Sequence, residues 1–270
     1  MRQIRNNSAK IAKELNINGP FNIQYIAKNN DVKVIECNLR ASRSFPFISK
    51  TLKYNFIEMA TEVIIGKKMD KIKIPLYDYE FVGVKAPQFS FTRLEGADPA
   101  TGVEMFSTGE VACLGDDFNE AFLKAMISVG LKLPIKSILI SSGPIESKAE
   151  LLESMRVLKK LGIKFYGTKG TADFLNKNNI STKLLYWPLE KKSPNVMEYI
   201  QAKKIDLVIN IPKNFNKEEL TNGYTIRRGA VEFAIPLITN RQIAMRLAES
   251  LFKYNSMPLK IKSMDEYKIK

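Results

Sequence analysis

The residue types best suited to chemistry in this sequence stand in one stretch near the amino end. Gln24 and the run that holds Glu36, Asn38, Arg40 and Arg43 supply two amide groups, one carboxylate and two guanidinium groups. Hard oxygen ligands suit Mg²⁺, which takes few protein ligands and leaves positions for phosphate oxygens, and the arginine fork fits phosphoryl groups. The stretch therefore predicts one wall of a site for a magnesium-bound nucleotide phosphate.

A β-hairpin would bring these side chains together. Two segments rich in β-forming residues flank a turn-forming cluster at residues 29–31. A three-residue loop pairs Lys28 with Val32, and counting back from that pair sets Gln24 opposite Glu36. We therefore expect the amide and the carboxylate to face each other across the two strands.

The two faces of this hairpin differ in chemistry. Because side chains alternate with period two, Asn38 joins Gln24 and Glu36 on the polar face. The other face is expected to pack on a core, and it carries Phe21, Ile23, Tyr25, Ala27, Ile35 and Cys37. An ordinary solvated sheet surface is the alternative to a metal site, but the two arginines next to the apolar residues of 41–50 favour the metal site.

Composition limits the possible chemistry. The chain has no histidine, so catalytic triads and imidazole bases are excluded, and reactions must use carboxylates, amides, lysine, arginine and metal. The net charge of +14 is compatible with a polyanion partner. However, the lysines are spread along the chain without a basic run, and we expect no nucleic-acid partner.

Three further observations bear on the compartment. No apolar run approaches the length of a membrane span, and the first seven residues lack a hydrophobic signal region. Cys37 and Cys113 are too few for a disulfide framework. We expect a soluble intracellular protein with no membrane partner, located in the cytoplasm or, alternatively, in the mitochondrial matrix.

The 270 residues have room for two domains, with a boundary near 130–134. Before it, helices are expected at 8–15, 56–66 and 118–129 and a strand at 81–86. After it, short apolar strands alternate with helices, which predicts a parallel sheet in a doubly wound α/β fold. The expected strands are 137–140, 163–166, 183–186, 207–211 and 236–238, and the expected helices are 146–161, 172–178, 195–202, 225–233 and 241–252. The lysine-rich end, 254–270, predicts a surface or frayed tail.

A second candidate site lies where the predicted parallel strands end, because ligands of open α/β sheets bind there. The turn Gly167-Thr168-Lys169-Gly170-Thr171 combines backbone N–H groups, hydroxyls and a helix start, which suits an anion. Lys148 could add a positive charge, and the ring of Trp187 could cover a base or a small acid. The alternative is that the turn only caps its helix and that the tryptophan belongs to the core.

The amino-terminal motif resembles a known family. The segment 22–66, with Ile35-Glu36-Cys37-Asn38-Leu39-Arg40-Ala41-Ser42-Arg43-Ser44 at its centre, resembles the end of the second ATP-grasp unit of the carbamoyl phosphate synthetase large chain. Leu39 stands where many bacterial members have proline, so the motif is similar to the eukaryotic branch. The resemblance implies that Gln24, Glu36 and Asn38 hold Mg²⁺ or Mn²⁺ on ATP and that Arg40 and Arg43 face the transferred phosphate.

The second half resembles the regulatory domain of the same large chain. Residues 132–252 are similar to its methylglyoxal-synthase-like (MGS-like) domain, which binds effectors at the strand tips. True methylglyoxal synthases use a catalytic histidine, so lyase activity is not expected. Users of N-acetylglutamate place asparagine where Lys213 stands, which favours a pyrimidine nucleotide (UTP or UMP) over N-acetylglutamate as effector. The resemblance implies an effector site lined by Lys148, Thr168, Thr171, Trp187, Asn210 and Asn222.

The resemblance also implies a domain plan and partners. We expect residues 1–130 to end a carbamate-phosphorylating unit, 131–255 to form the effector domain and 256–270 to be a basic tail. The glycine-rich loop and basic residues that grip ATP in the family are expected to come from the rest of the synthetase, and nitrogen from a glutaminase or ammonia. The isolated chain should then turn over no ATP, and a free-standing, non-catalytic regulatory module is the alternative.

Overall fold

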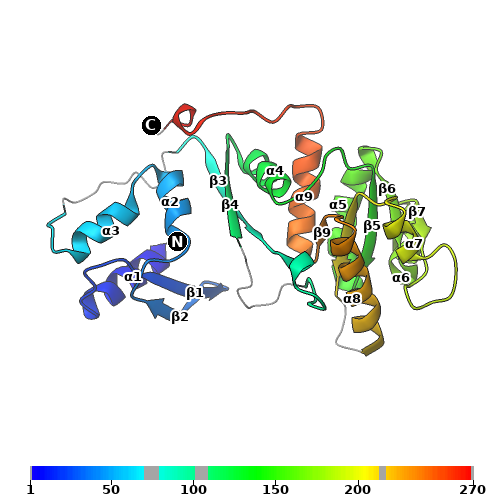
Figure 1. The fold of residues 1–270 in the computed structure, drawn as a ribbon, viewed down its shortest axis with the longest axis horizontal. Helices are drawn as coiled ribbons and strands as arrows, with labels where there is room; N and C mark the ends of the chain where they lie inside the picture. Colours follow the sequence, from blue (N-terminus) through cyan, green and yellow to red (C-terminus); the bar gives the residue numbers. More distant parts are fainter. Residues whose placement is uncertain (1, 70–78, 101–108, 213–216, 269–270) are drawn as a thin grey trace. The chain divides into compact units, whose positions relative to one another are not determined.

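The computed structural model describes residues 2–69, 79–100, 109–212 and 217–268 (Figure 1). The chain is divided into two compact units, which comprise residues 1–79 and residues 80–270. The second unit begins well before the expected boundary near 130, because helix α4 (Phe118–Ser128) contributes Phe122 and Leu123 to the core cluster of the parallel sheet. The described residues of the range 80–130 are thus part of the same compact unit as the sheet.

The first unit joins a hairpin to three helices. The hydroxyl groups of Ser8 and Tyr25 lie 2.7 Å apart and connect the first helix to the hairpin. None of the described residues of this unit is buried. Its elements are α1 (Arg2–Glu14), β1 (Asn22–Lys28), β2 (Asp31–Asn38), α2 (Phe45–Leu52), which was not predicted, and α3 (Phe56–Ile64).

The hairpin turn is shorter than predicted. Asn29 and Asn30 both have positive φ (51° and 64°), as a two-residue turn of type I′ requires, and Lys28 pairs with Asp31. The expected three-residue loop was therefore wrong. A bulge beside Gln24 adds one residue on β2 and restores the register, so that Gln24 does lie opposite Glu36.

The bulge also changes the apolar face of the hairpin. Ile35 is the extra residue and is 57 % exposed, and Ala27 near the turn is exposed as well. Ile23, Tyr25 and Cys37 are half-buried, as expected. The prediction that this face packs on a core is wrong for Ile35 and Ala27, because the bulge interrupts the alternation on which it rested.

The second unit opens with two antiparallel strands, β3 (Val82–Gln88) and β4 (Gly109–Gly115), against which α4 packs. The 3₁₀ turn η1 (Phe91–Arg93) follows β3. Strand β4 was not predicted, because residues 104–111 carried no clear strand pattern; residues 104–108 lie outside the described part. Asp117 begins α4 by accepting hydrogen bonds from the backbone N–H groups of Asn119 and Glu120.

The expected α/β class is confirmed by a five-stranded, fully parallel sheet of order β7-β6-β5-β8-β9. The chain leaves β5 towards β6 and β7, then returns to β8 on the other side, so the strand order reverses between β5 and β8. Helix α8 begins eight residues earlier than expected. The elements are β5 (Ser137–Ser142), α5 (Ile145–Lys160), β6 (Lys164–Gly167), α6 (Lys169–Lys177), β7 (Thr182–Leu184), α7 (Val196–Gln201), β8 (Leu207–Ile211), α8 (Lys217–Glu232), β9 (Leu237–Ile238) and α9 (Arg241–Lys253).

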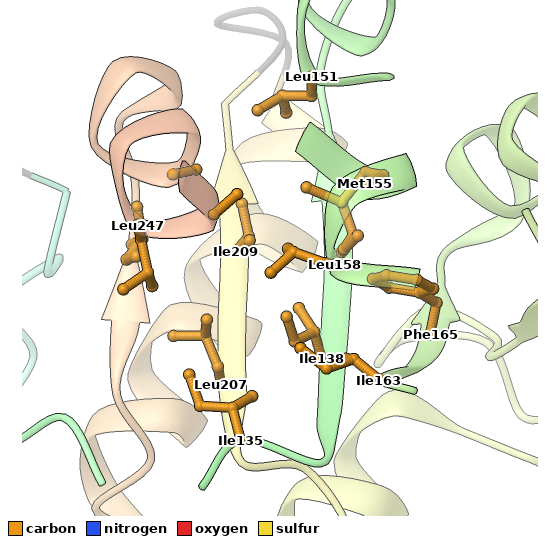
Figure 2. Packing of buried hydrophobic residues seen from close by; sticks show 14 of the residues in the cluster. Ile135, Ile138, Leu151, Met155, Leu158, Ile163, Phe165, Leu207, Ile209 and Leu247 are labelled. Carbon is orange, nitrogen blue, oxygen red and sulfur yellow. The ribbon is translucent and has the colours of Figure 1, made fainter. Parts of the chain in front are cut away.

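Alternation along the central strands supplies a core on each face of the sheet. Ile138 and Leu207 join one cluster with side chains of α5 and α9 (Figure 2). Leu139 and Val208, the next residue of each strand, join a second cluster with α7 and α8. Strands buried on both faces read as continuous apolar runs, which is why β5 and β8 were recognisable in the sequence.

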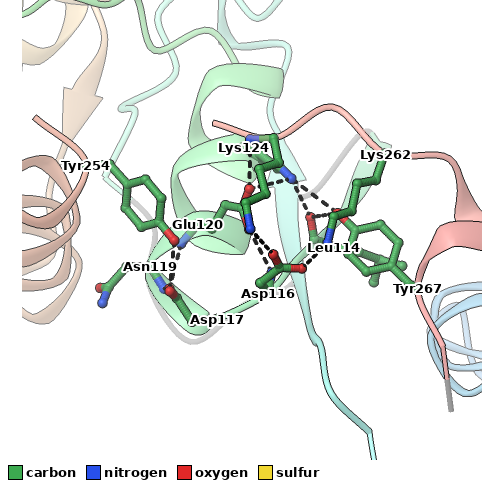
Figure 3. Close-up of polar contacts among 10 residues, drawn as sticks. Leu114, Asp116, Asp117, Asn119, Glu120, Lys124, Tyr254, Lys262 and Tyr267 are labelled. Carbon is green, nitrogen blue, oxygen red and sulfur yellow. Dashed lines mark hydrogen bonds and ion pairs between the residues drawn. The ribbon is translucent and has the colours of Figure 1, made fainter. Parts of the chain in front are cut away.

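The described part of the tail, 256–268, is docked rather than frayed. The Tyr267 hydroxyl donates to the Leu114 carbonyl oxygen at 3.0 Å, and the side chain is only 5 % exposed (Figure 3). Lys260 and Lys262 form ion pairs with Asp116 at 2.8 and 2.5 Å. The prediction of a frayed end was wrong because these contacts are with residues more than 140 positions away and leave no local pattern.

Asp117, next to Asp116 in the chain, should contribute to the stability of the fold in a way that depends on pH. Burial alone would raise the pKa of Asp117, but hydrogen bonds from Lys253, Tyr254 and the backbone lower it to about 2. A carboxyl with a lowered pKa stabilises the fold above its unfolded pKa, near 3.8, and this contribution is lost as the pH falls towards 2. Asparagine also caps helices well, and the Asp117 side chain is over one-third exposed. Asp117→Asn should therefore lower the free energy of unfolding at pH 7 by about 1 kcal/mol or less.

Urea titrations at pH 7 and pH 3 check this expectation. The difference between Asp117→Asn and wild type should shrink as the pH falls. An equal difference at both values would contradict the assignment of the effect to the charge.

Candidate hairpin and strand-end sites

The polar face of the hairpin brings three oxygen-bearing side chains together. Gln24 and Glu36 are directly opposite, and the Asn38 amide nitrogen donates to the Glu36 carboxylate at 2.9 Å. All three lie at least partly in solvent. The two-residue turn and the bulge are therefore the local features that align a carboxylate with two amides.

The two arginines follow this face without a carboxylate partner. Arg40 and Arg43 are exposed, and neither guanidinium forms an ion pair with any residue in the described part of the chain. The only hydrogen bond of Arg40 there is a 3.4 Å contact of its guanidinium with the Ala41 carbonyl oxygen. Both charges are thus free to meet an anion beside the hairpin face.

The donor set of this hairpin site (Gln24, Glu36, Asn38, Arg40 and Arg43) fits a hard divalent cation next to a phosphate. Across the described ranges, no three or more His, Cys, Asp and Glu side chains gather in a way that could hold a metal. A cation site there must therefore include amide oxygens, which the hairpin supplies beside one carboxylate. This composition suits Mg²⁺, which keeps positions open for phosphate oxygens.

The second candidate site lies beyond the carboxyl ends of the central strands. Ser141 of β5 and Asn210 of β8 are register partners at the point where the strand order reverses, the usual ligand position in open α/β sheets. Thr168, which follows β6, donates its hydroxyl to Ser141 at 3.2 Å and is buried. Three neighbouring strands thus place polar groups at one edge of the sheet.

The amino end of α6 faces the same edge. Thr168 immediately precedes this helix, but its hydroxyl donates to Ser141 and forms no capping hydrogen bond with the backbone of α6. The backbone N–H groups of Lys169 and Gly170 have no hydrogen-bond partner among the residues that the structure describes. The ammonium of Lys148 lies 3.6 Å from where a Cβ of Gly170 would stand. The helix start and the lysine therefore provide positive potential for an anion.

Thr171 ties this helix start to β5. Its hydroxyl oxygen accepts a hydrogen bond from the Ser142 backbone N–H at 3.1 Å. The hydroxyl of Ser142 is buried and has no partner in the described part of the chain. Such a group points to a missing acceptor or donor, which a ligand at this edge could supply.

Trp187 and Asn222 are joined through one loop. The Asn222 amide oxygen accepts from the Leu189 backbone N–H at 3.1 Å, and the Trp187 backbone N–H donates to Glu190 at 2.9 Å. The Trp187 side chain is half-buried against the second core cluster. Asn222 thus fixes the loop that carries the tryptophan. We call the six residues Lys148, Thr168, Thr171, Trp187, Asn210 and Asn222 the strand-end site.

Two residues beside the strand-end site, Arg227 and Asp98, were not predicted from the sequence. Arg227 of α8 donates to the Asn210 amide oxygen at 2.8 Å and pairs with Asp98. Asp98 is 129 residues away from Arg227, so their pairing leaves no local sequence pattern. The adjacent Arg227 and Arg228, in a helix that packs on the sheet, were the one indication of a functional arginine. Lys213, which bears on effector choice, lies outside the described residues.

Comparison with known proteins assigns both halves of the chain. Residues 1–72 match the family model "Carbamoyl-phosphate synthase L chain, ATP binding domain", and residues 150–239 match the model "MGS-like domain". Its two parts match the ATP-binding and MGS-like domains of carbamoyl phosphate synthetase large chains. The chain corresponds to the C-terminal portion of eukaryotic-type large chains, with the end of an ATP-binding domain followed by an MGS-like regulatory domain.

The relatives are much longer than this chain. Multifunctional protein pyr1-3 of Dictyostelium discoideum is 48 % identical over 269 residues, which is 97 % of the chain and 12 % of that protein. The mitochondrial carbamoyl-phosphate synthase [ammonia] of Homo sapiens is 44 % identical over 98 % of the chain and 18 % of its own length. Multifunctional protein CAD of Squalus acanthias is 43 % identical over 96 % of the chain and 12 % of its length. The chain thus spans less than a fifth of these relatives.

Two structural observations complete the comparison. A solved methylglyoxal synthase from Elizabethkingia anophelis aligns with 44 % of this chain and 80 % of its own, at 18 % identity and a TM-score of 0.35. Within the described part of the chain, no helix is both long enough and apolar enough to cross a membrane.

Proposed function

We propose that this chain supplies part of the Mg-ATP phosphate site for carbamate phosphorylation in a carbamoyl phosphate synthetase, together with the domain that senses its effector. The observation that carries the proposal is the register of Gln24 with Glu36 and the 2.9 Å hydrogen bond that joins Asn38 to the same carboxylate. Mg²⁺ or Mn²⁺ bound here would neutralise charge on the phosphoryl oxygens of ATP. Arg40 and Arg43 would orient and stabilise the transferring group.

The domain plan follows the resemblance. We assign residues 1–130 to the carbamate-phosphorylating unit and 131–255 to the effector domain, although 80–130 pack with the latter. The rest of the synthetase would provide the remaining ATP contacts, and a glutaminase or free ammonia the nitrogen. The relatives include a protein named mitochondrial and several multifunctional proteins, and we place this chain in the cytoplasm, with the mitochondrial matrix as the alternative.

The strand-end site would hold an anionic effector. The site offers donors and positive charge but no carboxylate. These come from Lys148, from the Ser142 hydroxyl and from the backbone N–H groups of Lys169 and Gly170, which have no partner among the described residues. This chemistry suits a phosphate or a carboxylate, and we favour a pyrimidine nucleotide such as UTP or UMP over N-acetylglutamate. The effector would regulate the synthetase through this domain.

A non-catalytic regulatory module is the second candidate function. The difference in the number of buried residues between the two units favours it for the isolated chain. The unit 80–270 has two core clusters, whereas no described residue of the unit 1–79 is buried. A hairpin site that lacks a packed surround cannot exclude water from phosphoryl transfer. The isolated chain should therefore bind effector without catalysis.

One titration tests this proposal. The 270-residue chain should form no carbamoyl phosphate from Mg-ATP, bicarbonate and ammonia, yet bind UTP in calorimetry. Thr171→Ala removes the hydroxyl that joins the start of α6 to the Ser142 backbone. Because the N–H donors of the helix start are then less well placed, UTP binding should weaken about tenfold, equivalent to one charge-assisted hydrogen bond of about 1.5 kcal/mol. Thr61→Ala, whose hydroxyl bonds only within its own helix α3, is the matched control. ATP-dependent formation of carbamoyl phosphate by this chain alone, or unchanged binding in Thr171→Ala, would contradict the proposal.

A further inference from the structure

A buried arginine joins the strand-end site to the segment that connects β3 with β4. Arg227 of α8 is 3 % exposed. Its Nε and Nη2 donate to the two carboxylate oxygens of Asp98 at 2.6 and 2.5 Å, and its Nη1 donates to the Asn210 amide oxygen at 2.8 Å. One planar group therefore holds an amide of the strand-end site and a carboxylate of a distant loop in a fixed relation.

The bond to Arg227 decides which end of the Asn210 amide is available. Because the amide oxygen is occupied, the free end is the nitrogen, which has no hydrogen-bond partner among the described residues. Asn210 is itself only 3 % exposed and lies at the carboxyl end of β8, opposite Ser141. The nitrogen is not among the fully buried side-chain atoms that lack a partner, so it stays accessible at this edge and can donate to a ligand oxygen.

The loop that carries Asp98 is held rigidly against α8. Tyr224 donates to the Gly96 carbonyl oxygen at 3.1 Å, and Arg228 donates to the Phe91 and Leu94 carbonyl oxygens at 3.0 and 3.2 Å. Tyr224, Arg227 and Arg228 are three and four residues apart, so they share one face of the helix. A shift of this face would therefore move the loop and the Asn210 contact together.

A purely structural salt bridge is the alternative to be weighed. Burial by itself would raise the pKa of Asp98, but the hydrogen bonds and charge of Arg227 lower it, so the carboxylate stays ionised. The Asp98 side chain is 38 % exposed, and an ion pair that is partly in solvent contributes little net stability. Stability alone also does not account for the third donor, which is directed at a residue of the strand-end site.

We propose that Arg227 is a positioning residue that presents the Asn210 amide nitrogen to an anionic oxygen of the effector and is itself oriented by Asp98. This inference rests on the proposed effector site. If it holds, Asp98 influences the affinity for the effector without contacting the effector itself. By linkage, bound effector must stabilise the Asp98–Arg227 pair by the same factor.

Calorimetry on the 270-residue chain tests the proposal with UTP and, in a separate arm, N-acetylglutamate as probes. Asp98→Asn weakens the orientation of Arg227 and should raise the dissociation constant about five- to tenfold. Glu232→Gln is the matched control, because it removes the carboxylate partner of the neighbouring Arg228 on the same helix and should leave the affinity unchanged. The arm that shows binding identifies a phosphate or a carboxylate as the recognised group.

A second variant separates positioning from stability. A Cβ on Gly223 would stand 3.0 Å from Nη1 of Arg227 and 3.9 Å from the Asn210 amide oxygen, so Gly223→Ala should shift the guanidinium by a few tenths of an ångström. Alanine is the better helix former, so the variant should unfold at the same or a higher temperature than wild type. Weaker effector binding in a variant that is no less stable would support positioning, since loss of fold cannot explain it.

Asn210→Asp provides the sharpest contrast. It keeps an oxygen for Arg227 but replaces the free donor with a second oxygen, so binding of either anionic probe should fall at least 30-fold. If wild type binds and Asp98→Asn, Gly223→Ala and Asn210→Asp bind equally well, the positioning role is overturned while the effector site stands. If wild type binds neither probe, the effector site and this inference fall together.

Discussion

Replacing Glu36 by glutamine should abolish most carbamoyl phosphate formation by a complete synthetase that contains this segment. Glu36 is the single carboxylate of the hairpin face and lies opposite Gln24. Without its charge, a cation on the nucleotide phosphates loses its one anionic protein ligand from this hairpin. By the usual scale for losing a preorganised charge contact, the transition state should lose roughly 3 kcal/mol, which is more than a 100-fold drop in rate.

Partial reactions locate this effect. The resemblance implies that a different ATP-grasp unit phosphorylates bicarbonate. Bicarbonate-dependent ATP hydrolysis should then persist in Glu36→Gln while carbamoyl phosphate formation is lost. Asp31→Asn at the end of the same hairpin is the matched control, because its exposed pair with Lys33 contributes little. Equal carbamoyl phosphate formation by Glu36→Gln and wild type would refute the assignment.

Removing the charge of Lys148 should have the next largest effect, on effector binding. Its ammonium lies beside Gly170 in the first turn of α6, where the helix start already favours an anion. A charge-assisted contact contributes about 2 kcal/mol, so Lys148→Met should weaken UTP binding about 30-fold. Lys177→Met, in the last turn of the same helix, should change it little.

Salt dependence separates a charge effect from a change of shape. Wild-type affinity for UTP should fall as ionic strength rises, and Lys148→Met should show a shallower dependence. The same salt dependence in both proteins would mean that the lysine does not face the effector.

The hairpin was predicted correctly for a partly wrong reason. A three-residue loop and a two-residue loop with a bulge give the same pairing of Gln24 with Glu36, because each adds one residue on the β2 side. Two asparagines with positive φ mark the shorter turn, but nothing in the local pattern marks the bulge at Ile35. The functional pairing could therefore be predicted, whereas the exposure of the apolar face could not.

The strand-end site was predictable because topology alone brings its members together. Once the βα alternation is recognised, the residues after β5, β6 and β8 must share one edge, as Ser141, Thr168 and Asn210 do. Contacts between segments far apart in sequence were not predictable in this way. The Asp98–Arg227 pair and the docking of Tyr267 on β4 depend on the packed structure and not on any period or motif.

The central claim is that the hairpin provides oxygen ligands to a cation on a nucleotide. Crystals of a complete synthetase containing this segment, grown with Mn²⁺ and a non-hydrolysable ATP analogue, would test it by anomalous scattering. The account predicts a manganese peak within about 2.3 Å of oxygens from Glu36 and from Gln24 or Asn38, a usual distance for such ions. Manganese on the phosphates with all three side chains beyond coordinating distance would contradict it.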